Sequence, residues 1–190
     1  MTRMLMRRGA VGLSLAGLVL AGCTSNPEPS PLPEPSESVG SPSPSSSPTV
    51  AAPSLPPEAK GTTEASAKAF VGHYVEAVNF GMQTGDTSAL ARLASDDCKT
   101  CDAIEQRIEE VYESGGRLAG AGWSIQSVNS LSTGDIRQPL LAVSIDIAAQ
   151  TMYADSTSPP SQSPASQGNL DFHLRRSDQT WQVHRLEATQ

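Results

Sequence analysis

The sequence predicts an α+β domain in which three N-terminal helices pack on an antiparallel sheet of four strands. Apolar residues recur at helical spacing over residues 62–112 and then alternate with polar residues over residues 123–183. Ahead of them, 11 of the 15 prolines in the 190-residue chain lie within residues 24–60, together with 10 serines. Such a stretch cannot bury enough apolar surface to order itself, so a single domain is predicted over residues 61–190.

The first predicted helix covers residues 62–84 and ends at Gly85. Its apolar stripe has the spacing of one helix face: Ala67, Phe70, Val71, Tyr74, Ala77, Val78 and Gly81. A short second helix follows, with Leu90, Leu93 and Ala94 facing inward. The third begins near Asp102, with Glu105 as its partner in a capping box, and ends at Gly115-Gly116. Its inner residues are Ile104, Ile108, Val111 and Tyr112.

Four strands are predicted after the helices. The first contains Trp123, Ile125 and Ser127 at alternate positions, and the second, over residues 141–148, has the clearest alternation in the chain. Residues 155–168 form a predicted polar loop. The last two strands place Leu170, Phe172 and Leu174 opposite Trp181 and Val183, across a short turn near Ser177-Asp178.

The chain begins with a leader. Arg3, Arg7 and Arg8 are followed by an apolar run over residues 9–20, which is the pattern of a secretory signal peptide. The run is shorter than the ~20 residues that a membrane-spanning helix needs. It ends in Leu20-Ala21-Gly22-Cys23, which resembles the lipobox of bacterial lipoproteins.

The lipobox resemblance implies that residues 1–22 are removed and that Cys23 becomes the lipidated N-terminus, carrying diacylglycerol and palmitate. Two or more acyl chains hold a protein stably on a bilayer. We therefore expect a lipid anchor at the extracytoplasmic face of the cell membrane, with the Sec and twin-arginine export routes both open.

Residues 23–60 comprise the lipidated cysteine and a Pro/Ser-rich disordered linker. Its reach is roughly 35 Å as a coil and about 115 Å fully extended, enough to hold a domain away from a membrane.

Residues 61–190 contain 9 basic and 16 acidic residues, a net charge of −7. An acidic domain is repelled by phosphate backbones, so nucleic acid is excluded as a partner.

Several short motifs resemble one family. They are Tyr74-Val75-Glu76-Ala77-Val78-Asn79, Thr84-Gly85-Asp86, Cys98-Lys99-Thr100-Cys101, Gly115-Gly116-Arg117 and Trp123. Together they are similar to the domain-of-unknown-function 6318 family of actinobacterial lipoproteins. The order of helices and strands is similar to the wider nuclear-transport-factor-2-like (NTF2-like) fold, a cone of curved sheet around helices. The family has no assigned activity, so the resemblance implies a fold without catalytic roles.

Cys98 and Cys101 are the sharpest chemical motif of the domain. With Cys23 assigned to the lipid, two thiols are left in an oxidising compartment, which favours a disulfide between them. A redox-active pair and half of a zinc site are the alternatives. The sequence has no second CxxC or HxxxH to complete a zinc site, and Asp96, Asp97 and Asp102 surround the pair with negative charge.

Four aromatic residues are candidate pocket lining, because they lie on inferred inner faces: Tyr74, Tyr112, Trp123 and Trp181. Relatives of this fold that act as enzymes place a carboxylate or histidine inside the cone. Asp146, the acid in the second predicted strand, alternates with the apolar residues and is therefore expected on the outer face. His173 and His184, with Asp171, are a candidate metal group, and a polar outer sheet face is the preferred interpretation.

The sequence therefore predicts a membrane-anchored lipoprotein whose domain is a non-catalytic binding or interaction module. No cofactor, metal or catalytic residue is expected. The expected partner is an envelope protein or a small apolar ligand, and the sequence sets no oligomeric state. The alternative functions are a SnoaL-like small-molecule enzyme and an envelope thiol-disulfide protein that uses the Cys98-Lys99-Thr100-Cys101 motif.

Overall fold

The computed structural model describes residues 50–131, 137–178 and 180–189, which fall within one compact unit, Ser46–Gln190. The expected leader, the expected lipidation site Cys23 and the expected linker up to residue 49 lie outside the described residues. Within the described residues, no helix has the length and apolar character needed to cross a membrane.

Helix α1 (Glu64–Thr84) runs through the centre of the unit. It begins in a capping box, in which the Thr63 and Ser66 side chains accept hydrogen bonds from each other's backbone N–H groups at 3.0 and 3.1 Å. It ends at Gly85, which is in the left-handed conformation with φ 80°. A Cβ at Gly85 would lie 2.5 Å from the Tyr112 ring, so glycine also allows α3 to pack closely against the end of α1.

The packed unit begins ahead of the expected boundary at Gly61. A short 3-10 helix, η1 (Pro57–Ala59), lies beside α1. Ala59 is fully buried and Leu55 packs against the core. Residues 55–59 therefore belong to the domain rather than to the linker, because their few apolar side chains are covered by the start of α1.

Helices α2 (Ser88–Ala91) and α3 (Lys99–Glu113) follow. Helix α3 begins three residues before the expected start at Asp102, with Cys98 as its N-cap and no side-chain capping bond. The expected capping box of Asp102 and Glu105 is therefore wrong. The reason is the disulfide between Cys98 and Cys101, which encloses the first turn of α3 and places Asp102 inside the helix.

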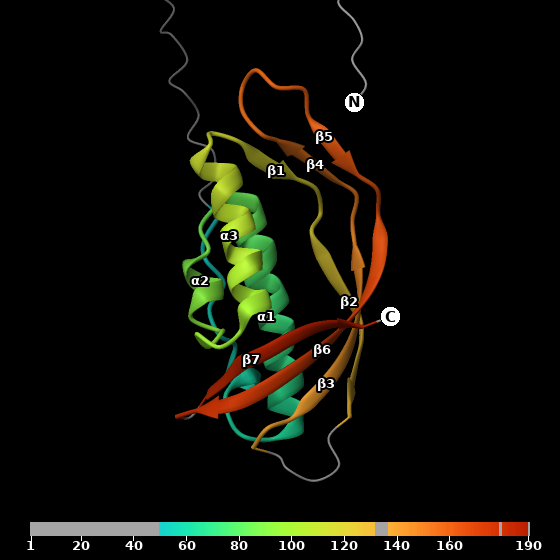
Figure 1. Cartoon of the computed structure of the whole chain (residues 1–190). Helices are drawn as coiled ribbons and strands as arrows, with labels where there is room; N and C mark the ends of the chain where they lie inside the picture. The colour runs from blue at the N-terminus through green and yellow to red at the C-terminus, as the bar shows by residue number, and fades with distance from the viewer. Residues whose placement is uncertain (1–49, 132–136, 179, 190) are drawn as a thin grey trace, which may run out of the picture. The chain divides into compact units, whose positions relative to one another are not determined.

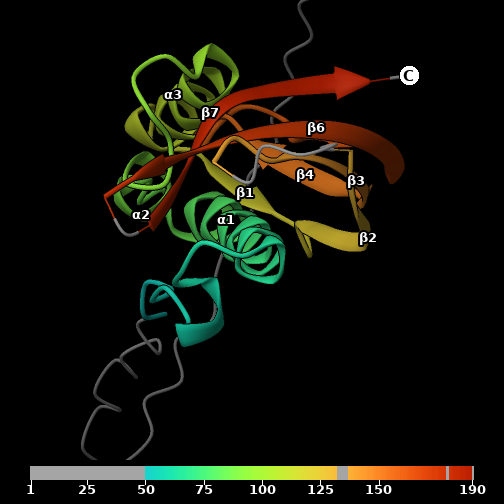
Figure 2. The ribbon, with the colours of Figure 1, turned by 90° about the horizontal axis from the view of Figure 1, so that it is seen from below.

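The large sheet has the strand order β2-β3-β6-β7 and is antiparallel throughout: β2 (Trp123–Ser130), β3 (Leu140–Ile147), β6 (Ser166–Ser177) and β7 (Thr180–Thr189). These are the strands that the alternation predicts. Figure 2 shows them curving around one side of α1. The inner face carries the buried residues Leu141, Val143, Ile145, Phe172, Leu174, Trp181, Val183 and Leu186. The predicted α+β class, with helices packed on an antiparallel sheet, is confirmed.

Bulges change the side-chain parity of two strands. In β2 the register shifts between Ile125 and Ser127, so Val128 instead of Ser127 packs against the core. A second shift between His173 and Leu174 allows both Val183 and Leu186 of β7 to face inward. A strict alternation cannot predict either change.

A second, small sheet of order β1-β4-β5 is absent from the sequence-based expectation: β1 (Arg117–Ala119), β4 (Gln150–Tyr153) and β5 (Ser161–Ser163). It lies beside the ends of α1 and α3 (Figure 1). The expected loop at residues 155–168 is wrong in part, because it contains β5 and the start of β6. Short strands of exposed serine and glutamine have no hydrophobic alternation that could reveal them.

Candidate functional site

A groove of about 510 Å³ lies between the two long helices and the small sheet. Helix α1 contributes Val78 and Met82, and the sheets contribute Leu118, Trp123, Gln150, Met152, Ser161 and Ser163. Helix α3 contributes Thr100, Ala103, Ile104, Arg107, Ile108 and Val111. Its volume is in the range of small-molecule sites, about 300–1,000 Å³.

The groove has an apolar floor and a polar mouth. Val78, Ile108 and Val111 at its base are at most 5% exposed. The exposed lining residues are mostly polar: Thr100, Ala103, Arg107, Ser161 and Ser163. An apolar ligand would thus lose contact with water on entering, whereas a polar end would stay at the mouth.

Trp123 is held at the groove by Asn79 of α1. The Asn79 amide donates to the Trp123 carbonyl at 2.8 Å and accepts from the Trp123 N–H at 2.7 Å. Gly122 precedes this residue with φ 77°, and a Cβ there would collide with the Asn79 side chain. The amide thus completes the hydrogen bonding of a strand end and joins α1 to the large sheet.

Of the four aromatic residues expected to line a pocket, only Trp123 is among the described residues that line the groove. Tyr74 and Trp181 are 0% and 1% exposed and form part of a solid core. The Tyr74 ring packs edge-on against Phe172 at 5.5 Å, and the Trp181 indole donates to the Ser66 hydroxyl at 3.1 Å. The expectation for these two residues is wrong, because α1 closes directly onto the inner face of the large sheet.

Tyr112 also lies outside the groove. Its ring packs against Gly85 and its hydroxyl donates to the Met82 carbonyl at 2.8 Å, so it binds the ends of α1 and α3 together. No pattern in the sequence indicates that Met82, Leu118 and Met152 line a groove. Leu118 and Met152 sit in the small sheet, and the helical stripe assigned to α1 omitted Met82.

A second hollow of about 360 Å³ adjoins the groove and shares Met82, Leu118 and Gln150 with it. Its remaining lining residues are small or carry an amide: Asn79, Gln83, Ala119, Gly120, Ala121 and Gly122. The Gln150 amide lies 4.0 Å from the Met82 sulfur, at the boundary between the two hollows.

Arg107 is the one charged residue among the described residues that line the groove. Its Nη2 donates to the Met152 sulfur at 3.4 Å, a contact between α3 and β4. Its Nη1 lies 3.8 Å from a Glu110 carboxylate oxygen, beyond a normal hydrogen bond. The guanidinium therefore lies against the wall of the groove with most of its donors directed to solvent.

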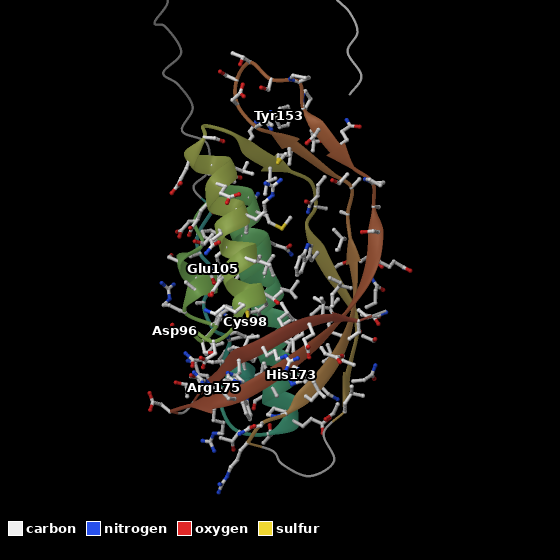
Figure 3. The ribbon with its side chains drawn as sticks, viewed as in Figure 1. Asp96, Cys98, Glu105, Tyr153, His173 and Arg175 are labelled. Carbon is white, nitrogen blue, oxygen red and sulfur yellow. A yellow bond between two sulfur atoms is a disulfide. The ribbon has the colours of Figure 1, made fainter. Side chains whose placement is uncertain are left out.

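No carboxylate or imidazole is among the groove-lining residues that the structure describes. Burial, and then the charges of Asp102 and Glu109, raise the pKa of Glu105 to about 7, yet Glu105 is on a different face of α3 (Figure 3). Its charge adds to burial in raising the pKa of Tyr74. The Tyr74 hydroxyl is buried without a hydrogen-bond partner among the described atoms. Neither Glu105 nor Tyr74 is therefore among the described groove-lining residues.

The two histidines of the candidate metal group, His173 and His184, belong to β6 and β7 of the large sheet. His173 Nε2 lies 2.9 Å from Glu187, whereas His184 Nδ1 lies 3.7 Å from Asp97, beyond hydrogen-bond distance, so the two imidazoles lie beside different carboxylates. Asp97 also pairs with Arg175 at 3.2 Å. Across the described ranges, no three metal-ligating side chains come together. Asp146 also faces outward and accepts from the Gln126 and Gln167 amides at 2.7 and 3.0 Å.

Cys98 and Cys101 form a disulfide with a Cα–Cα distance of 5.2 Å at the start of α3 (Figure 3). Both residues are 0% exposed. The neighbouring loop is bound to β7, because the Ser95 N–H donates to the Val183 carbonyl at 3.0 Å and the Val183 N–H to the Leu93 carbonyl at 2.8 Å. The disulfide is thus enclosed between the α2–α3 connection and the core.

The model of a family of unknown function, DUF6318, matches residues 43–187, which include every helix and strand described above except the last two residues of β7. The chain belongs to the DUF6318 family. This agrees with the motifs that resemble the family. No curated protein matches the sequence.

The DUF6318 domain is similar to several solved structures. The intermembrane space region of the chloroplast protein ARC6 is 12% identical with a TM-score of 0.49, over 65% of this chain and 93% of that one. An uncharacterized protein with a cystatin-like fold from Caulobacter vibrioides is 11% identical with a TM-score of 0.44, over 65% and 89%. An NTF-2 like protein of unknown function from Shewanella oneidensis MR-1 is 12% identical with a TM-score of 0.38, over 65% and 99%.

Proposed function

We propose that this DUF6318 domain is a non-catalytic binding module that takes a small, largely apolar ligand into the groove between α1, α3 and the small sheet. The observation that carries the proposal is the composition of the groove. Its base is buried and apolar, and it holds Trp123 together with two methionines, Met82 and Met152. Methionine side chains adapt to ligands of different shape, and an indole offers a large flat contact surface.

The same lining supports binding rather than catalysis. An acid–base reaction needs a titratable side chain within hydrogen-bond distance of the substrate. The polar atoms at the mouth belong instead to hydroxyl, amide and guanidinium groups. The enclosed Cys98–Cys101 disulfide favours a structural role over thiol exchange, which needs access to a sulfur atom.

A neutral apolar fluorophore, N-phenylnaphthylamine, tests the binding function. We expect its emission to rise on binding to the domain, and Ala103→Phe to abolish most of this rise by filling the groove at its exposed mouth. Ala91→Phe is the matched control, because Ala91 is exposed on α2 and outside the groove. Equal binding by both variants, or none by the unmodified domain, would contradict the proposal.

We propose further that the chain is lipid-anchored at Cys23 and that the Pro/Ser-rich linker holds the domain away from the membrane surface. The lipobox sequence supports this. In a bacterial host, the full chain should partition into the detergent phase, and Cys23→Ser should move it to the aqueous phase, with Ser25→Ala as control. Globomycin should cause the unprocessed form to accumulate. Aqueous partitioning of the unmodified chain would contradict the anchor.

A further inference from the structure

We propose that the ligand of the groove is an anionic amphiphile, with a single apolar tail on the groove floor and a carboxylate head bound by Arg107 at the mouth. This inference rests on the proposed binding function and specifies its ligand. The observation behind it is a charge asymmetry: the described lining has one cation, no anion, and an apolar base.

The geometry of Arg107 suits a ligand head at the mouth. Its side chain is 64% exposed, and the Nη2–Met152 contact at 3.4 Å directs the guanidinium along the wall made by β4. A guanidinium has five N–H donors arranged to bind a carboxylate through two of them at once. A sulfur atom is a weak acceptor, so this contact is readily exchanged for a carboxylate.

Glu110 is the acidic group nearest to Arg107, and it competes weakly. Its carboxylate is 3.8 Å away and 68% exposed, and ion pairs between exposed groups contribute little. A ligand carboxylate that is attached to a buried tail is held at the mouth, so its local concentration exceeds that of a free anion. The ligand therefore replaces the Glu110 contact.

The remaining mouth residues extend the same preference. Thr100, Ser161 and Ser163 bring hydroxyl groups to the exposed part of the lining, and hydroxyls can donate to a carboxylate. The buried residues Val78, Ile108 and Val111 offer no polar group to the other end of the ligand. The change from polar residues at the mouth to apolar residues at the base therefore sets the orientation of the ligand, with its tail inward and its head outward.

Three probes with the same tail test the charge preference: decanoate, decanol and decyltrimethylammonium, each below its micelle concentration. Calorimetry should give the order decanoate, decanol, decyltrimethylammonium from tightest to weakest. Arg107→Gln should weaken decanoate binding up to about fivefold, since an ion pair between partly exposed groups contributes little, and should leave decanol binding unchanged. Arg107→Lys should retain part of the preference. Arg92→Gln, an exposed arginine outside the groove, is the control.

The outcomes separate the two proposals. If decanol binds but decanoate binds no better, or if Arg107→Gln does not change decanoate affinity, the anionic-head inference is wrong and the apolar groove function stands. If none of the three probes binds to the unmodified domain, both proposals fail. Tighter binding of the cationic probe would overturn the assignment of Arg107 directly.

Discussion

The side chain of Asn79 satisfies both backbone groups of Trp123. It accepts from the Trp123 N–H at 2.7 Å and donates to the Trp123 carbonyl at 2.8 Å. Trp123 is the first residue of β2 and lines the groove, while Asn79 lies on α1. One amide therefore fixes the helix, the start of the large sheet and the groove wall relative to one another.

Asn79→Ala should lower the free energy of unfolding by about 1–3 kcal/mol, because it leaves the half-buried Trp123 N–H and carbonyl without their partner. Urea unfolding measures this change. Asn129→Ala is the control, since the Asn129 amide is exposed and makes one long contact of 3.5 Å with Ser127. An equal, small effect of both substitutions would mean that the Asn79 bonds contribute nothing net.

Gly122→Ala should destabilise the domain more than Gly115→Ala. The two glycines have nearly the same backbone angle, φ 77° and 79°, so the conformational cost of a side chain is matched. A Cβ at Gly122 collides with Asn79, whereas a Cβ at Gly115 meets nothing within 4 Å. We expect the difference in unfolding free energy to exceed about 1 kcal/mol. Equal effects would show that Asn79 can move away without cost.

The Cys98–Cys101 disulfide should resist reduction in the folded domain, since both residues are 0% exposed. Dithiothreitol followed by thiol labelling and mass spectrometry should find the bond intact without denaturant and reduced in urea. The double variant Cys98→Ala/Cys101→Ala should lose about 2 kcal/mol of stability, the loop-closure value for so short a loop. Fast reduction of the folded protein, together with insulin reductase activity, would contradict a structural role for the disulfide and support the thiol-disulfide alternative.

Glu105→Gln should stabilise the domain at pH 8 and not at pH 4. Burial, with Asp102 and Glu109 adding to it, raises the pKa of Glu105 from 4.5 to about 7, so the folded state binds more protons than the unfolded state between these values. Stability therefore falls as the pH rises through this interval. After allowance for partial exposure, the gain is about 1 kcal/mol. Thermal unfolding against pH measures it, with Glu110→Gln on the same helix as control. A gain of equal size at both pH values would exclude ionisation of Glu105 as its cause.

The parts of the fold that the sequence predicts are those with a long, one-sided apolar pattern. Helix α1 and strands β3, β6 and β7 bury one face each, so periodicity locates them. The small sheet was not predicted, because β5 buries none of its residues and β1 is only three residues long. The bulge in β2 reverses the parity after Ile125, which a pattern of period two cannot anticipate.

The site was harder to predict than the fold. The position of Trp123 in the pocket lining can be predicted from strand alternation. The disulfide can be predicted from the number of cysteines left after Cys23 is assigned to the lipid. Tyr74 and Trp181 lie on inward faces, as Trp123 does, and are nevertheless core, because periodicity indicates which face a side chain is on and not whether a pocket lies in front of it. Arg107 could not be found from the sequence, since its position at the groove depends on Met152 in a strand that the sequence did not reveal.

Tryptophan emission during a titration with decanol tests the groove most directly, because the chain has two tryptophans and they lie in different environments. Trp123 lines the groove and is partly exposed, whereas Trp181 is 1% exposed in the core. We predict a saturable blue shift in the unmodified domain that is absent from Trp123→Phe, with calorimetry showing that this variant still binds. An unchanged spectrum in the unmodified domain, or the same shift in Trp123→Phe, would contradict ligand binding in this groove.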